Sequence, residues 1–171
     1  MMPQLIILNK QKKLLGFTLV ELLIYMGLIS ILMVMITQLF GAIFDVKIES
    51  EANSAVDQDG RFILSRLIHD IERSSAIITP LNYGSSSGNL VLTISGAANT
   101  YSVSGGNLQL TNNSGTNSVN SSQTTVSNMT FQKIGDEAAN ETVKITFTVS
   151  SIAQRTAGSE VRTFQTTVGR R

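Results

Sequence analysis

An uncharged apolar run near the N-terminus constrains this chain more than any other feature. No charged residue occurs from Leu22 to Phe44, a run of 23 residues. A run of more than about 18 apolar residues predicts a membrane-spanning helix, and at about 1.5 Å per residue this one would be ~35 Å long. Glu21 stands at the start of the run, where a carboxylate is costly unless it has a partner. The interpretation of the chain therefore depends on which group pairs with Glu21.

The distribution of lysines around the run predicts its orientation. Lys10, Lys12 and Lys13 precede it, and only Lys47 follows closely. The positive-inside rule then places the N-terminus in the cytoplasm and the C-terminal part outside. The basic start resembles that of a secretory signal, but the apolar run is too long for one and no Ala-x-Ala pattern follows it. We therefore expect a protein that crosses the bacterial cytoplasmic membrane once.

Composition excludes several classes of protein. The 171 residues carry a net charge of +1, with no cysteine and a single histidine. Disulfides, cysteine-type zinc sites, thiol catalysis and iron–sulfur clusters are therefore excluded. Basic residues do not cluster as a nucleic-acid-binding face requires, and the Gly-x-Ser-x-Gly pattern of many serine hydrolases is absent. We expect no enzymatic activity, no cofactor and no metal site.

A helical pattern continues beyond the apolar run. From Asp45 the composition turns polar, and charged residues separate the apolar ones. Pairs such as Asp57–Arg61 and Asp70–Arg66 have the i,i+4 spacing of helical ion pairs. The apolar residues recur at intervals of three, four or their sums, namely Val46, Ala52, Val56, Ile63, Leu67, Ile71 and Ile78. This spacing predicts an amphipathic helix with one apolar stripe.

One long helix accounts for both segments. No proline occurs between Pro3 and Pro80, so nothing separates the apolar run from the amphipathic segment. The pattern predicts a helix from about Phe17 to Ile78, roughly 90 Å long. Thr79–Pro80 is expected to end it, because proline disfavours helical backbone at the preceding residue. Residues 17–44 would form the membrane-spanning half of this helix, and residues 45–79 the amphipathic half.

The remainder, residues 80–171, shows the period of two that is typical of strands. The predicted strands are Asn89–Ser95, Thr100–Ser104, Asn107–Thr111, Val126–Ile134, Thr142–Ser150 and Glu160–Val168. Gly105–Gly106 favours a hairpin between the second and third of them, and Thr111–Thr125 is expected to be a mobile loop. The chain is therefore predicted to be α+β, with a long helix packed on a C-terminal antiparallel β-sheet domain.

The boundary between the basic start and the apolar run carries a family resemblance. Residues 13–22 read KLLGFTLVEL. This segment resembles the N-terminal signal of type IV pilins and of the pseudopilins of type II secretion, a family with a long N-terminal helix followed by a β domain. The resemblance implies that a prepilin peptidase removes a leader, residues 1–16, by cutting between Gly16 and Phe17. It also implies that the new N-terminus at Phe17 becomes methylated.

The resemblance also gives Glu21 a partner. Cleavage would create a positively charged amine at a helix start, where the helix dipole favours a nearby carboxylate instead. Subunits in a helical filament are axially offset, so Glu21 of one copy would meet the Phe17 amine of another and fix the register of assembly. The alternative is an incidental acid near the membrane surface. Tyr25, one turn further on, could donate a hydrogen bond across subunits or serve as an interface anchor.

The leading hypothesis is a structural, prepilin-like subunit of a type IV pilus or a type II secretion pseudopilus. Its expected partners are the prepilin peptidase, other pilin or pseudopilin subunits and assembly-platform proteins. Residues 61–73 resemble minor pseudopilins of the J type, and the C-terminal cysteine pair of many major pilins is missing. The rival hypothesis is a membrane-anchored binding module that never enters a filament and uses its exterior β domain to bind a ligand.

The remaining polar candidates are interpreted as ordinary solvated groups. His69 lies beside Asp70 without the further ligands that a metal or catalytic site needs. Asp57 with Asp59, and Asp136 with Glu137, lack the spacing of a calcium loop. We therefore expect His69 to be exposed or to cap the helix, and these acids to be solvated.

Overall fold

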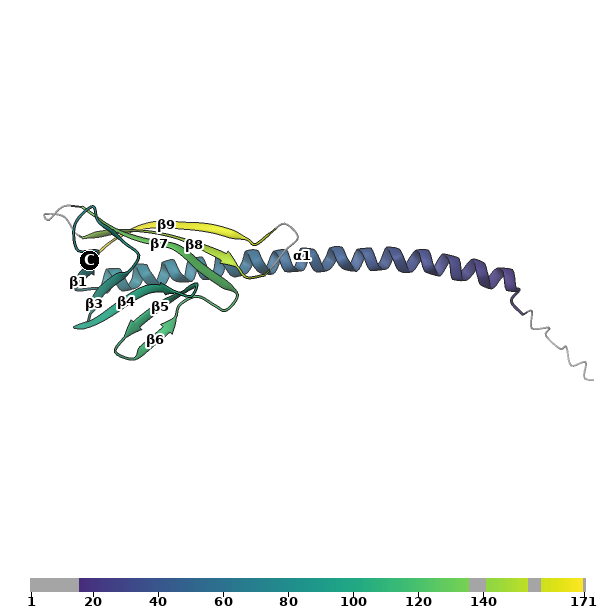
Figure 1. The fold of residues 1–171 in the computed structure, drawn as a ribbon, viewed down its shortest axis with the longest axis horizontal. Helices are drawn as coiled ribbons and strands as arrows, with labels where there is room; N and C mark the ends of the chain where they lie inside the picture. Colours follow the sequence, from purple (N-terminus) through teal and green to yellow (C-terminus); the bar gives the residue numbers. More distant parts are fainter. Residues whose placement is uncertain (1–15, 136–140, 154–157, 171) are drawn as a thin grey trace, which may run out of the picture. The chain divides into compact units, whose positions relative to one another are not determined.

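A single long helix opens the fold. The computed structural model describes residues 16–135, 141–153 and 158–170. The expected leader up to residue 15 and the pair at 136–137 lie outside the described residues. Helix α1, Leu19–Arg73, contains 55 residues (Figure 1). The prediction of one helix that joins the apolar run to the amphipathic segment is confirmed.

The strands form two antiparallel sheets (Figure 1). Within the described residues the strands are β1 Ala76–Thr79, β2 Ser86–Ser87, β3 Leu90–Ile94, β4 Ala97–Ser104, β5 Asn107–Asn112, β6 Gly115–Ser118, β7 Thr124–Ile134, β8 Thr142–Ser151 and β9 Val161–Gly169. One sheet has the order β1-β3-β4-β5-β6, and the other β2-β7-β8-β9. The α+β class and the positions of the six predicted strands are confirmed. Period-two alternation marks strands without saying which of them pair, so the division of the β domain into two sheets is seen only in the structure.

Two segments behave differently from their sequence-based predictions. The segment Thr111–Thr125, expected to be a mobile loop, contains strand β6, which pairs with β5. The helix ends at Arg73, so its predicted end at Thr79 was wrong. The Ser74 hydroxyl donates to the carbonyl of Ile71 at 2.7 Å and competes with the helical backbone pattern there. The β-branched residues that follow are better suited to strand β1 than to a helix.

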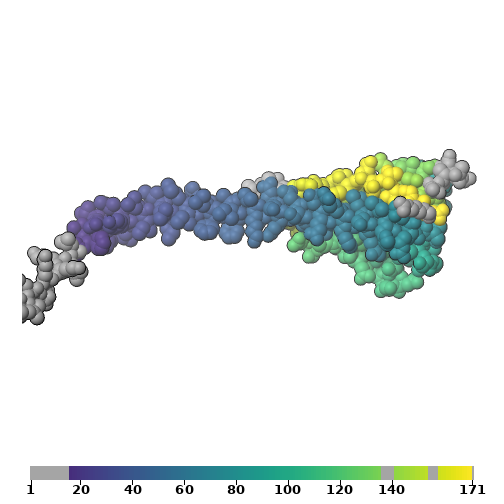
Figure 2. Space-filling model, turned by 180° about the vertical axis from the view of Figure 1, so that it is seen from behind, coloured from purple at the N-terminus to yellow at the C-terminus, as the bar shows by residue number. Residues whose placement is uncertain are grey.

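The chain divides into two compact units, Met1–Ile43 and Phe44–Arg171. In the second unit, one face of α1 packs on the sheets, and its fully buried side chains include Val56, Ile63, Leu67 and Ile71. The sheets add Leu90, Leu92, Tyr101, Leu108, Phe131, Val143, Ile145, Phe147 and Val149 to the same core. No strand in the described part of the chain covers the opposite face of this part of α1 (Figure 2), where Arg61, Ser65 and His69 are exposed. The amphipathic stripe predicted from sequence is therefore the face that holds the helix in its unit.

A buried carboxylate fastens α1 to the segment between β6 and β7. Asp59 is only 8% exposed, so the expectation that it is solvated was wrong. Its Oδ2 accepts hydrogen bonds from the backbone N–H of Ser121 at 3.0 Å, from the Ser121 hydroxyl at 2.7 Å and from the Thr124 hydroxyl. Asp57, two residues earlier, is 37% exposed and pairs with Arg162 of β9 at 2.5 Å. Asp59 is therefore a buried hydrogen-bond acceptor, whereas Asp57, only two residues away, forms a partly exposed ion pair.

A second buried carboxylate connects α1 to the five-stranded sheet. Asp70 accepts a hydrogen bond from the hydroxyl of Tyr101 on β4 at 2.5 Å. Its Oδ2 also lies 3.2 Å from Nε of Arg66, which confirms the i,i+4 pair predicted from sequence. A hydrogen bond that Arg66 donates to the Tyr101 hydroxyl oxygen, together with the charge of Asp70, raises the pKa of Arg66. Asp70 thus has both a neutral and a charged donor, which offsets the cost of burying its charge.

We expect the stability of this unit to fall at alkaline pH because of Tyr101. Burial, followed by the hydrogen bond to Asp70, raises the pKa of the Tyr101 hydroxyl well above its ordinary value of about 10. The unfolded chain therefore releases this proton first, and folding stability decreases as the pH rises above that ordinary value. Chemical unfolding measured between pH 8 and 11 should show this slope, and Tyr101→Phe should reduce it. An equal slope in the variant would assign the effect to other groups.

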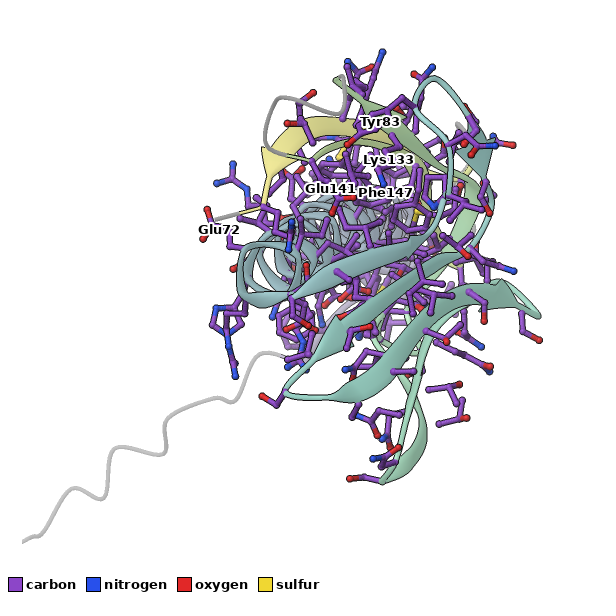
Figure 3. All side chains as sticks on the ribbon, turned by 90° about the vertical axis from the view of Figure 1, so that its left-hand side faces the viewer. Glu72, Tyr83, Lys133, Glu141 and Phe147 are labelled. Carbon is purple, nitrogen blue, oxygen red and sulfur yellow. The ribbon has the colours of Figure 1, made fainter. Side chains whose placement is uncertain are left out.

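A buried lysine, Lys133, lies beside Glu141 and Tyr83 (Figure 3). Lys133 on β7 is 4% exposed, and its Nζ lies 2.6 Å from Oε1 of Glu141 and 4.8 Å from the centre of the Tyr83 ring. The other Glu141 oxygen lies 3.2 Å from Nε of Arg170. Glu141 precedes β8 and Arg170 follows β9, so one carboxylate joins the ends of three neighbouring strands.

Candidate processing and assembly site

The segment that precedes α1 is not helical, and a threonine defines where the helix begins. Gly16, Phe17 and Thr18 lie before the first helical residue, Leu19. The side-chain oxygen Oγ1 of Thr18 accepts a hydrogen bond from the backbone N–H of Glu21 at 3.2 Å. This is the geometry of an N-cap, which satisfies a backbone donor that the first helical turn leaves unpaired. The peptide bond between Gly16 and Phe17 therefore lies in non-helical backbone directly before a capped helix.

Glu21 occupies the third position of the helix and is partly enclosed. Threonine at the cap with glutamate three residues later is the sequence pattern of a capping box, and an acid in the first turn also suits the helix dipole. Glu21 is the least exposed of residues 16–51. The hydroxyl of Tyr25 lies 3.4 Å from its Oε1, and the ring of Phe17 meets the Tyr25 ring edge-on, with centroids 6.1 Å apart. Phe17, Glu21 and Tyr25 thus form one cluster.

Apart from Gln38, the helix beyond this cluster presents apolar groups and two hydroxyls that bond within the helix. Its side chains from Leu22 to Phe44 are exposed within the chain (Figure 2), and the segment is long and apolar enough to cross a membrane. The hydroxyl of Ser30 donates to the carbonyl of Met26, and that of Thr37 to the carbonyl of Met33, each at 2.8 Å. Since each hydroxyl has a partner in its own helix, neither requires water. This part of α1 is therefore suited to apolar surroundings.

The structure brings together the residues that the sequence singled out at this end of the chain. Gly16 and Phe17 lie directly before the helix, and Glu21 lies one turn inside it. The role of Thr18 as a cap was missed, although the Thr-x-x-Glu spacing is visible in the sequence. For Tyr25, a hydrogen bond across subunits and an interface anchor were both left open, and the structure shows a contact with Glu21 of the same chain. A Phe17 amine paired with Glu21 of another copy remains a prediction.

His69 does not join any candidate site. It is exposed on α1, and its Nε2 lies 3.0 Å from Nη1 of Arg73, one turn further along the helix. Because arginine can only donate, this imidazole nitrogen acts as the acceptor. The expectation of an exposed histidine at the end of the helix is confirmed.

Comparison with known proteins supports the resemblance at the N-terminus. Residues 12–37 match the model of the prokaryotic N-terminal methylation motif. No curated protein and no solved structure matches the chain. The match ends before residues 61–73, so the similarity of that segment to J-type pseudopilins stays a prediction.

The matched residues contain both the junction before α1 and the first part of the apolar helix. They include the non-helical junction at Gly16 and Phe17, the cap at Thr18 and the partly enclosed Glu21, and they continue into the apolar helix. The motif is typical of structural subunits rather than of enzymes. Residues 12–37 therefore match the prokaryotic N-terminal methylation motif, which is the signal found in type IV pilins and pseudopilins.

Proposed function

We propose that this chain is a minor structural subunit of a type IV pilus or a type II secretion pseudopilus. The observation that carries the proposal is the junction at Gly16–Phe17. A non-helical segment is followed at once by a capped helix with an acid in its first turn and an exposed apolar surface behind it. Such a junction leaves the peptide bond reachable by a peptidase, while the helix remains anchored in the membrane.

The proposed sequence of events begins with cleavage on the cytoplasmic side. A prepilin peptidase hydrolyses the Gly16–Phe17 bond, which removes the leader, residues 1–16, and leaves an amine on Phe17 that is then methylated. Residues 17–44 stay in the cytoplasmic membrane, and the chain from residue 45 onward lies outside. Glu21 then pairs with the Phe17 amine of a neighbouring copy as the subunit enters the filament. Pairing offsets the cost of each charge in apolar surroundings.

We expect prepilin peptidase to shorten the chain by its first 16 residues. The test is to produce the full chain with and without the peptidase and to measure the intact mass from membranes. The processed form should begin at Phe17 and carry the additional mass of one methyl group on its amine. Gly16→Leu should remain unprocessed, because a large side chain would then stand on the acyl side of the cleaved bond.

Gly41→Ala is the matched control, since an added Cβ at Gly41 meets no atom within 4 Å and the position is far from the junction. This variant should be processed like the unchanged chain. A mature protein that retains its leader in the presence of active peptidase would contradict the proposal. It would favour the rival function, a membrane-anchored binding module that never enters a filament.

A further inference from the structure

Glu21 already has a hydrogen-bond donor within its own chain. The Tyr25 hydroxyl lies one helical turn away, 3.4 Å from Glu21 Oε1. Side chains at i and i+4 share a helix face, so this contact needs no change in the backbone. The Phe17 ring packs edge-on against the Tyr25 ring at an interplanar angle of 81°. Phe17 therefore helps to hold Tyr25 beside the carboxylate.

The geometry of this contact makes it replaceable. Bonds between a hydroxyl and an oxygen acceptor are usually 2.5–3.0 Å long, so a separation of 3.4 Å marks a weak one. A protonated amine carries a full charge and forms shorter and stronger hydrogen bonds to a carboxylate than a neutral hydroxyl does. When an amine reaches Glu21, it should therefore displace the Tyr25 hydroxyl.

We propose that Tyr25 is the partner of Glu21 in the unassembled subunit, and that the Phe17 amine of a neighbouring copy takes its place during assembly. This inference rests on the proposed function. In a membrane, an isolated subunit lacks the Phe17 amine of a second copy, and Glu21 needs a donor to offset the cost of its charge. Tyr25 supplies that donor and thereby stabilises the pool of unassembled subunits.

The exchange has a measurable consequence for the balance between membrane and filament. A group that stabilises only one of two states shifts the population toward that state. The Tyr25 hydroxyl therefore opposes assembly, whereas the Glu21 carboxylate favours it. Removing the hydroxyl should increase the assembled fraction, and removing the carboxylate should decrease it. Two residues in contact are thus predicted to have opposite effects.

The test is Tyr25→Phe in the full chain, produced with prepilin peptidase and the assembly machinery. Phenylalanine keeps the ring and its contact with Phe17, and removes only the hydroxyl. Filaments are sheared from cells, and the ratio of sheared to membrane-bound subunit is measured by quantitative immunoblotting. We expect this ratio to rise about 3- to 10-fold, as the loss of one hydrogen bond from one state implies. Intact mass should show that processing at Phe17 is unchanged.

Thr37→Val is the matched control. It also removes one hydroxyl from the apolar helix, but that hydroxyl bonds to the Met33 carbonyl and not to Glu21. Its assembly ratio should equal that of the unchanged chain. A ratio for Tyr25→Phe that is unchanged or lowered would overturn the role of Tyr25 and leave the proposed function intact. Two other results would overturn the proposed function as well. One is normal filament assembly by Glu21→Ala, and the other is a chain without substitutions that keeps its leader in the presence of the peptidase.

Discussion

Replacing Asp59 with alanine should lower the free energy of unfolding of the Phe44–Arg171 unit by about 3–5 kcal/mol. Three donors converge on one buried oxygen of this carboxylate. A hydrogen bond to a charged group contributes about 1.5–3 kcal/mol, and a buried donor left without a partner costs about 1–3 kcal/mol. Alanine would leave the Thr124 hydroxyl in that state, because Thr124 is only 1% exposed. The segment between β6 and β7 would then lose its attachment to α1.

Asp57→Ala provides the control for this prediction, because it removes an acid two residues away on the same helix. The Asp57–Arg162 pair is partly exposed, and such pairs contribute about 0–1 kcal/mol. Urea-induced unfolding of the detergent-solubilised full chain, followed by the near-ultraviolet circular dichroism of its tyrosines, would compare the two variants. Tyr101 is fully buried in this unit and reports its packing. Equal losses for the two variants would mean that the Asp59 hydrogen bonds do not fasten the segment.

The parts of the structure that sequence predicted well depend on neighbouring residues. The ten residues from Lys13 to Leu22 carry the resemblance to pilins by themselves. The helix followed from an apolar periodicity and an absence of proline, and its i,i+4 pair Asp70–Arg66 was predicted correctly. Strand positions followed from period-two alternation. Each of these patterns repeats between residues that are close together in the sequence, so it is visible without knowing the fold.

The parts that were missed depend on residues far apart in the chain. The partners of Asp59 lie 62 and 65 positions away, so its charge looked like that of any solvated helix face. The assignment of strands to two sheets depends on which apolar faces meet around α1, and alternation leaves this undetermined. Tyr25 illustrates a third case, in which a hydrogen bond across subunits was weighed against an interface anchor and the contact with Glu21 of the same chain was overlooked. A contact between residues i and i+4 of one helix needs no second subunit, so it was the simpler expectation.

Gly60→Ala should destabilise the same unit by about 2 kcal/mol, although alanine is the better helix former by ~1 kcal/mol. A Cβ atom at Gly60 would lie 2.1 Å from Cζ of the Phe164 ring, well inside van der Waals contact. That ring cannot easily move away, because it stacks on the fully buried Phe147 with centroids 5.5 Å apart and an interplanar angle of 18°. The glycine is thus required for the close approach of β9 to the helix, and not for its backbone conformation.

A double-mutant cycle separates this steric cause from a general effect on the helix. In a Phe164→Leu background the ring is absent, so Gly60→Ala should cost little or even stabilise the helix by ~1 kcal/mol. Ser65→Ala, at an exposed position on α1, measures the effect of an alanine where nothing lies in its way. If Gly60→Ala cost the same free energy of unfolding with and without the Phe164 ring, the clash would not be its cause. The predicted coupling instead makes Gly60 and Phe164 a matched pair, in which the absence of one side chain creates the space for the other.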